Sequence, residues 1–220
     1  MSRFAHLTYT APVREVQQEQ GSLAAADRRL AGGDPGPDVL GPAEQEFVGE
    51  LDGFYLATVN VDGWPYVQYR GGPPGFVHVL DEHTLALADV RGNRQYLSAG
   101  NLRTNDKVAL FFMQYSTRTR LKVLGRARTV ALDAEPALAA RLADVQTDGR
   151  AERLLVIDVE GVDWNCPQHI TPRFTVAEIE QGVSALQTRI EELERENRLL
   201  REGAGPVSYT HLTLPTILRV

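Results

Sequence analysis

Residues 54–70, FYLATVNVDGWPYVQYR, decide the fold, because two runs of strand-forming residues flank the turn Asp62-Gly63. An Asp-Gly pair in this setting is a strong signal for a β-hairpin. Five more runs of the same kind follow, separated by turn sequences such as GGPPG at 71–75. They occupy residues 76–81, 84–90, 107–115, 120–132 and 153–164. Seven short strands with few helices between them predict a mainly β (α+β) fold, with an antiparallel barrel over residues 51–173.

Helical patterns flank and interrupt this barrel. Residues 1–50 are expected to form an N-terminal helical segment. It contains two predicted helices, over 15–33 and 43–52, with a turn-rich linker between them. Between two strands, residues 91–106, RGNRQYLSAGNLRTND, predict a helix that starts at its Gly-Asn pair. Residues 136–149 predict a helical connection before the last strand.

Residues 174–202 carry a heptad repeat. Val176, Val183, Ile190 and Asn197 occupy position a, and Ile179, Leu186, Leu193 and Leu200 occupy position d. β-Branched residues at a, mostly Leu at d and one Asn at a favour a parallel two-stranded coiled coil. Arg189 and Glu196 at position g then face Glu194 and Arg201 at position e of the partner helix. The alternative is a single amphipathic helix that packs on its own barrel.

The last predicted segment, residues 203–220, is a linker followed by VSYTHLTLPTILRV at 207–220. Residues 207–216 are the translation of a DNA sequence that resembles the reverse complement of a transposase library adaptor. We therefore interpret this tail as a sequencing-adaptor artefact and exclude it from the fold. The alternative is a natural disordered tail.

Composition excludes several classes of function. The 220 residues include 29 acidic and 23 basic side chains, and the net charge of −6 argues against a nucleic-acid partner. No apolar run approaches the ~18 residues of a membrane span, and the start, MSRFAHLTYT, lacks a signal-peptide pattern, so we expect a cytoplasmic protein. The single cysteine excludes an internal disulfide, and five scattered histidines give no metal-ligand spacing, so no metal site is expected.

Three arginines lie where the predicted strands end. Arg70 closes a strand, and Arg91 and Arg94 follow another strand at the start of the predicted helix. Guanidinium groups form two-pronged hydrogen bonds with phosphate oxygens, and a helix start also favours an anion. The pattern indicates a phosphate site, with solvated turn residues as the alternative for Arg91 and Arg94.

These segments resemble the pyridoxamine 5′-phosphate oxidase-like family of FMN-binding split β-barrels. The resemblance rests on LATVNVDGWPYVQYRGGPPGF at 56–76, LALADVRGNRQYLSAGNLRTNDKVALFFM at 85–113, RLKVLGRARTV at 120–130 and WNCPQHITPR at 164–173. The similarity looks closest to the branch described as predicted flavin-nucleotide-binding proteins. It implies an FMN cofactor, a homodimer with the flavin at the subunit interface, and an FMN-dependent oxidoreductase.

The resemblance also implies a set of flavin-binding residues. Arg70 matches the family's strand arginine, Asn93 and Arg94 match its Ser-Arg pair, and Gln95 stands where the oxidases have Lys. Arg120 falls where they place a Gln against the flavin ring, with a surface arginine as the alternative. Trp164 and Arg173 resemble residues that complete the pocket from the partner subunit, with a core tryptophan as the alternative for Trp164. The full expected set is Arg70, Gly71, Asp89, Arg91, Gly92, Asn93, Arg94, Gln95, Arg120, Trp164 and Arg173.

Two departures from the family argue against a vitamin B6 substrate. GGPPG replaces the segment in which the oxidases carry a substrate-binding Lys, and CPQHITPR holds His169 without the family's Arg-x-His pair. We therefore expect a different substrate and assign no catalytic residue. A non-catalytic flavin carrier or sensor, and a haem-binding barrel, are the alternatives. Cys166 is expected to be a small pocket-lining residue rather than a redox thiol.

Overall fold

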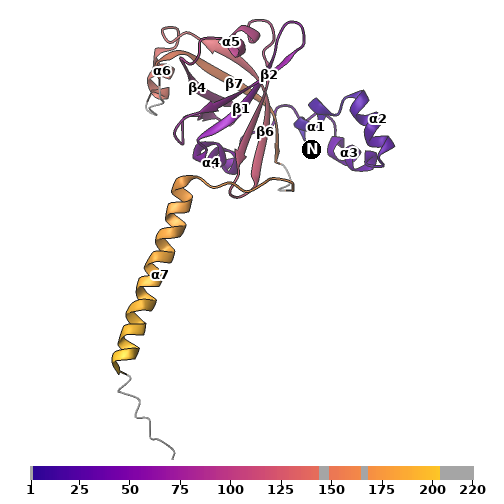
Figure 1. The fold of residues 1–220 in the computed structure, drawn as a ribbon. Helices are drawn as coiled ribbons and strands as arrows, with labels where there is room; N and C mark the ends of the chain where they lie inside the picture. The colour runs from indigo at the N-terminus through magenta and orange to yellow at the C-terminus, as the bar shows by residue number, and fades with distance from the viewer. Residues whose placement is uncertain (1, 144–148, 165–167, 204–220) are drawn as a thin grey trace, which may run out of the picture. The chain divides into compact units, whose positions relative to one another are not determined.

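The structure is a computed structural model that describes residues 2–143, 149–164 and 168–203 (Figure 1). The chain divides after Pro172 into two compact units. The first unit contains the barrel and the N-terminal helices, and the second contains the C-terminal helix. Cys166 and the tail after residue 203 lie outside the described residues.

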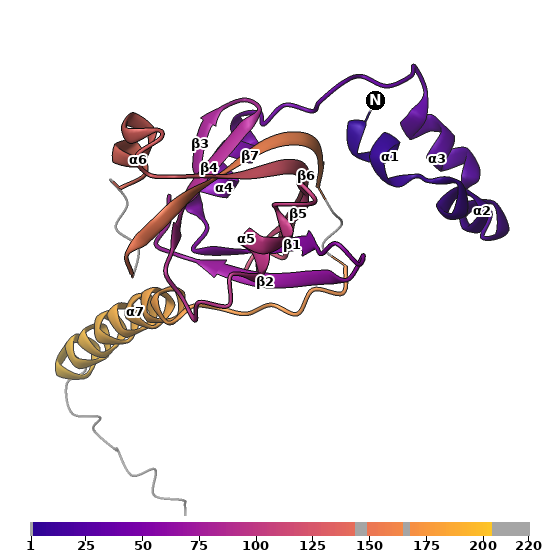
Figure 2. The ribbon, with the colours of Figure 1, turned by 90° about the horizontal axis from the view of Figure 1, so that it is seen from above.

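The first unit contains all seven predicted strands. They are β1 (Gly53–Val59), β2 (Pro65–Gly71), β3 (His78–Asp81), β4 (Thr84–Val90), β5 (Lys107–Gln114), β6 (Thr119–Val130) and β7 (Ala151–Trp164). Every pairing is antiparallel, in the order β2-β1-β5-β6-β7-β4-β3. The sheet curls so that β1 and β2 lie across the barrel from β3 and β4 (Figure 2). This is the mainly β, split-barrel fold that the sequence predicts.

The barrel core follows from the alternation of side chains along the strands. Phe54 and Leu56 of β1 point inward and are fully buried, while Tyr55 between them points outward. Phe54 stacks on Phe112 of β5 with ring centroids 4.9 Å apart. Helix α4 (Pro42–Glu50) adds Val48 to the same core. Each such buried side chain stabilises the fold by roughly 1.5–3 kcal/mol.

A glycine permits the bend in the two longest strands. The register of β6 and β7 shifts between Leu124 and Gly125. A Cβ atom on Gly125 would lie 2.6 Å from the carbonyl oxygen of Asp158, so only glycine fits this close approach. Such a bulge increases the local twist and helps the sheet to curl.

The N-terminal segment differs in detail from the prediction. Residues 2–50 form four helices, α1 (Arg3–Thr8), α2 (Ala11–Glu19), α3 (Leu23–Leu30) and α4. The single helix predicted over 15–33 is therefore wrong, whereas α4 matches the helix predicted over 43–52. The chain turns at Gly21, whose φ of +71° ends the helical path. Helix α1 packs against β7, where a Cβ atom on Gly161 would lie 2.9 Å from Cα of Phe4.

The helix predicted from Gly92-Asn93 is also shorter than expected. Residues 91–96 form a loop, and α5 covers only Leu97–Asn101. Arg94 and Tyr96 have φ angles of +64° and +55°, a left-handed conformation that cannot continue a right-handed helix. Helix α6 (Pro136–Leu142) matches the start of the predicted connection.

The second unit contains one long helix, α7 (Val176–Gly203). Its bounds agree with the heptad repeat to within two residues, and none of its residues is buried. Over the described ranges, no helix combines the length and the apolar character that crossing a membrane requires.

Candidate functional site

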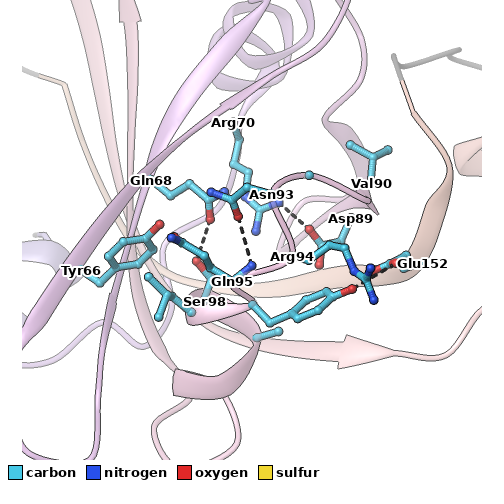
Figure 3. A pocket seen from close by; sticks show the side chains of 14 residues that line it. Tyr66, Gln68, Arg70, Asp89, Val90, Asn93, Arg94, Gln95, Ser98 and Glu152 are labelled. Carbon is cyan, nitrogen blue, oxygen red and sulfur yellow. Dashed lines mark hydrogen bonds and ion pairs between the residues drawn. The ribbon is translucent and has the colours of Figure 1, made fainter.

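A polar pocket lies where β2, the end of β4, the 91–96 loop and α5 meet (Figure 3). We call it the arginine pocket. Six of the residues expected from the sequence line it together: Arg70, Asp89, Gly92, Asn93, Arg94 and Gln95. They come from two strands and a loop that are up to 25 residues apart in the sequence, so the fold gathers them at one place.

Strand β2 and helix α5 form one wall of the arginine pocket. Side chains alternate along β2, so Tyr66, Gln68 and Arg70 share the pocket face. The buried Ser98 of α5 donates a hydrogen bond of 3.0 Å to the Gln68 side chain. Asn101, one turn further along α5, donates to Thr58 of β1 at 2.9 Å. These two bonds fix the short helix, and with it the loop, against the sheet.

Asp89 at the end of β4 holds two arginines. Arg70 forms an ion pair with Asp89, and both side chains are mostly buried. The Nε atom of Arg153 lies 3.6 Å from the other oxygen of Asp89. The Nε atom of Arg70 is buried and has no hydrogen-bond partner among the described residues.

Glu152 of β7 anchors the far side of the loop. Its carboxylate accepts a hydrogen bond of 3.2 Å from the Tyr96 hydroxyl and one of 3.0 Å from Arg153. The Nε atom of Arg91 lies 3.6 Å from the same carboxylate. Arg91 is thus directed to Glu152 and does not line the pocket.

Arg94 is the pocket arginine without a carboxylate partner within the described residues. Its loop is shaped locally, because the Asn93 side chain accepts a hydrogen bond of 3.1 Å from the Gln95 backbone N–H. This Asx turn contains the left-handed residue 94, and the Arg94 side chain lines the pocket together with Arg70 and Asp89. The pocket can therefore bind an anion without first breaking an ion pair.

The remaining expected residues do not join the pocket within one chain. Gly71 ends β2 and is absent from the lining. Arg120 lies on the outward face of β6, with its guanidinium 6.0 Å from the Phe111 ring centroid. Trp164 packs edge-on against Phe47 of α4, and its indole N–H donates to Glu44 at 2.5 Å. Arg173 belongs to the second unit.

The sheet formed by β2, β1, β5 and β6 exposes an apolar outward face. We call it the outer barrel face; it is made by Tyr55, Ala57, Val67, Tyr69, Ala109 and Phe111. Val67 and Tyr69 are each more than half exposed. Burial raises the pKa of Tyr69 above its ordinary value, and nearby Asp52 and Tyr55 add to the rise, so this hydroxyl is uncharged at neutral pH.

Sequence analysis missed several residues of the arginine pocket. Tyr66 and Gln68 could have been found, because they alternate with Arg70 along one strand. Glu152 gives no such signal: it reaches the loop because β7 pairs with β4, with Arg153 opposite Asp89. Across the described ranges, no group of three or more His, Cys, Asp or Glu side chains is placed to hold a metal ion.

Comparison with known proteins places the chain in a family. The sequence model of the pyridoxamine 5′-phosphate oxidase family matches residues 40–166, more than half of the chain. The chain belongs to this family. None of the curated proteins matches it.

Several solved structures are similar to this chain. An FMN-binding protein from Syntrophomonas wolfei is 13% identical, covers 71% of this chain and 98% of its own, and has a TM-score of 0.43. HupZ from Group A Streptococcus is 16% identical over 59% of this chain and 95% of its own, with a TM-score of 0.45. General Stress Protein 26 from Bacillus anthracis is 15% identical over 59% and 92%, with a TM-score of 0.39.

Proposed function

We propose that this protein binds FMN, with the flavin phosphate in the arginine pocket, and acts as an FMN-dependent oxidoreductase. The observation that carries the proposal is the guanidinium of Arg94, which has no carboxylate partner in the described structure and lines the pocket beside Arg70. Membership of a family that includes flavin enzymes agrees with this assignment.

The charges around the pocket fit a phosphate monoester. The pocket lining holds two arginines, Arg70 and Arg94, and two carboxylates, Asp89 and Glu152. Arg91 and Arg153 lie outside the lining and approach the same carboxylates, so the wider group carries two more positive than negative charges. The unpartnered Nε of Arg70 is a further buried donor. Charge-assisted hydrogen bonds of this kind are about twice as strong as neutral ones. Gln95 replaces the family's Lys, and the surplus of arginine charge compensates for that loss.

The flavin ring needs more cover than one chain supplies. The pocket lining is mostly polar, whereas the ring is flat and largely apolar. We propose that a second copy docks on the outer barrel face and completes the site, as in the homodimer that the family resemblance implies. Burying this exposed apolar face would stabilise the dimer by roughly 25 cal/mol for each Å² removed from water. Arg120 lies on the sheet that carries this face. We propose that Arg120, Trp164 and Arg173 all lie at the subunit interface.

Bound FMN would supply the two-electron chemistry, and the protein would position and tune it. In this proposal, Arg120 places a positive charge near the ring and so stabilises negative charge that develops there, which raises the reduction potential. Trp164 covers one face of the ring and excludes water. Arg94 and Arg70 hold the phosphate and so fix the position of the ring.

The substrate is proposed to differ from pyridoxamine 5′-phosphate. The segment after β2 is Gly72-Pro73-Pro74-Gly75, which offers no cationic side chain. Phe76 N donates to the Pro73 carbonyl at 3.0 Å, so the segment is a tight turn that leads to β3. A substrate with a less acidic group fits this surface better than a second phosphate does.

An absorbance spectrum of the freshly purified protein tests the proposal. The two bands of oxidised flavin, with FMN identified after release by heat, support it. A Soret band would indicate a haem-binding protein instead, and a protein that is colourless and fails to take up added FMN would refute flavin binding. Loss of the flavin bands on addition of NADH or NADPH separates an oxidoreductase from a carrier or sensor, which would keep its oxidised spectrum.

A further inference from the structure

Helix α7 presents a continuous apolar stripe to solvent. Seven of the eight side chains at positions a and d are aliphatic, and each is at least 41% exposed. They are Val176, Ile179, Val183, Leu186, Ile190, Leu193 and Leu200. A stripe of this length is costly to leave in water, so a partner must cover it.

Local hydrogen bonds cap the N-terminus of α7. Thr175 Oγ1 accepts a hydrogen bond of 3.2 Å from the Glu178 backbone N–H, and the Glu178 carboxylate accepts one of 2.7 Å from the Thr175 backbone N–H. This reciprocal pair is a capping box, which fixes a helix start without help from another unit. Helix α7 thus has its own start signal and an uncovered face.

We propose that α7 forms a parallel, in-register coiled coil with α7 of a second copy of this chain. The proposal goes beyond flavin binding, because it assigns a second interface outside the barrel. Asn197 at position a is the first argument for the partner. In a parallel coil in register, the two Asn197 side chains meet and hydrogen-bond to each other within the apolar seam. A different partner helix, or a shifted register, would leave this amide against aliphatic side chains.

The charges beside the seam select the parallel orientation. In a parallel pair, Arg189 faces Glu194 of the other helix, and Glu196 faces Arg201, so both contacts are attractive. In an antiparallel pair that overlaps fully, Arg189 faces its own copy, Glu180 faces Glu194, and Asn197 faces Ile179. That arrangement sets like charges together and buries an unpaired amide.

The Arg189 side chain is compatible with this contact. It already donates a hydrogen bond of 2.9 Å to Glu192 on its own helix. A guanidinium has five N–H donors, so it can keep this bond and still reach Glu194 across the seam. Both Arg189 and Glu192 are more than half exposed.

Cysteine cross-linking of the full-length chain tests the proposal, in a Cys166→Ser background. Leu186→Cys places a thiol at position d, where the two copies of a parallel coil bring their Cα atoms within the ~4.4–6.8 Å span of a disulfide. We expect a covalent dimer to form at least about tenfold faster than with Glu192→Cys, the outward-facing control on the same helix. Equal rates for the two variants, or no covalent dimer with Leu186→Cys, would overturn the proposal.

Two further experiments address orientation. Mixing Leu186→Cys with Ile190→Cys chains of different size should give mostly homodimers, because these positions face each other only in the antiparallel coil; mostly mixed dimers would refute the parallel arrangement. Arg189→Glu should slow cross-linking through Leu186→Cys, and adding Glu194→Arg should restore it. A charge swap that changes nothing would show that these side chains do not meet.

Discussion

Replacing Arg94 by alanine tests the phosphate site most directly. The guanidinium lines the arginine pocket and has no carboxylate partner within the described structure, so the substitution breaks no ion pair there. Its loss should remove one charge-assisted hydrogen bond to the flavin phosphate, worth about 1.5–3 kcal/mol. Because each 1.4 kcal/mol is a factor of ten, FMN affinity should fall by roughly 10- to 150-fold.

Fluorescence titration of the apoprotein with FMN and with riboflavin measures this effect. Riboflavin lacks the phosphate, so its affinity should change little in the Arg94→Ala variant. Arg103→Ala is the matched control, because it removes the same charge from a residue outside the pocket lining. The FMN affinity of Arg94→Lys should lie between those of Arg94→Ala and the natural protein, since an ammonium keeps the charge but lacks the planar, two-pronged geometry of a guanidinium. Equal losses for FMN and riboflavin would place Arg94 away from the phosphate.

Three more outcomes are expected. Asp89→Asn should lower the free energy of unfolding by about 1–3 kcal/mol, because it leaves the mostly buried Arg70 without its charged partner. The control, Asp158→Asn, alters an exposed pair with Arg128 and should change this free energy little. Equal shifts in the melting temperature of the two variants would contradict the expectation. Val67→Arg on the outer barrel face should give a folded monomeric barrel in sedimentation of chains truncated after Phe174, while Val61→Arg at the exposed hairpin turn should leave the dimer intact. Deleting residues 207–220 should change neither the melting temperature nor the flavin content, and a drop of several degrees would show that the tail belongs to the fold.

The sequence by itself determined the strands and the long helix. Alternating apolar residues around Asp62-Gly63 specify a hairpin locally, and the heptad over 174–202 specifies a helix locally, so α7 (Val176–Gly203) agrees closely with it. These signals are carried by residues that are near each other in the chain. The arginine cluster was also visible, because a family motif places Arg70 and Arg94 at fixed points of the strands.

Only the tertiary structure decided how the pocket charges are divided. Arg70 and Arg91 are paired with Asp89 and Glu152, whereas Arg94 has no carboxylate partner within the described residues. This division depends on β4 pairing with β7 and on two left-handed residues in the 91–96 loop. The same loop delays the start of the predicted helix to Leu97, because Arg94 and Tyr96 adopt left-handed conformations that a right-handed helix cannot contain. Contacts between distant strands carry no local sequence pattern. The position of Glu152 beside the loop, and with it the lack of a carboxylate partner for Arg94 within the described residues, could therefore be seen only in the fold.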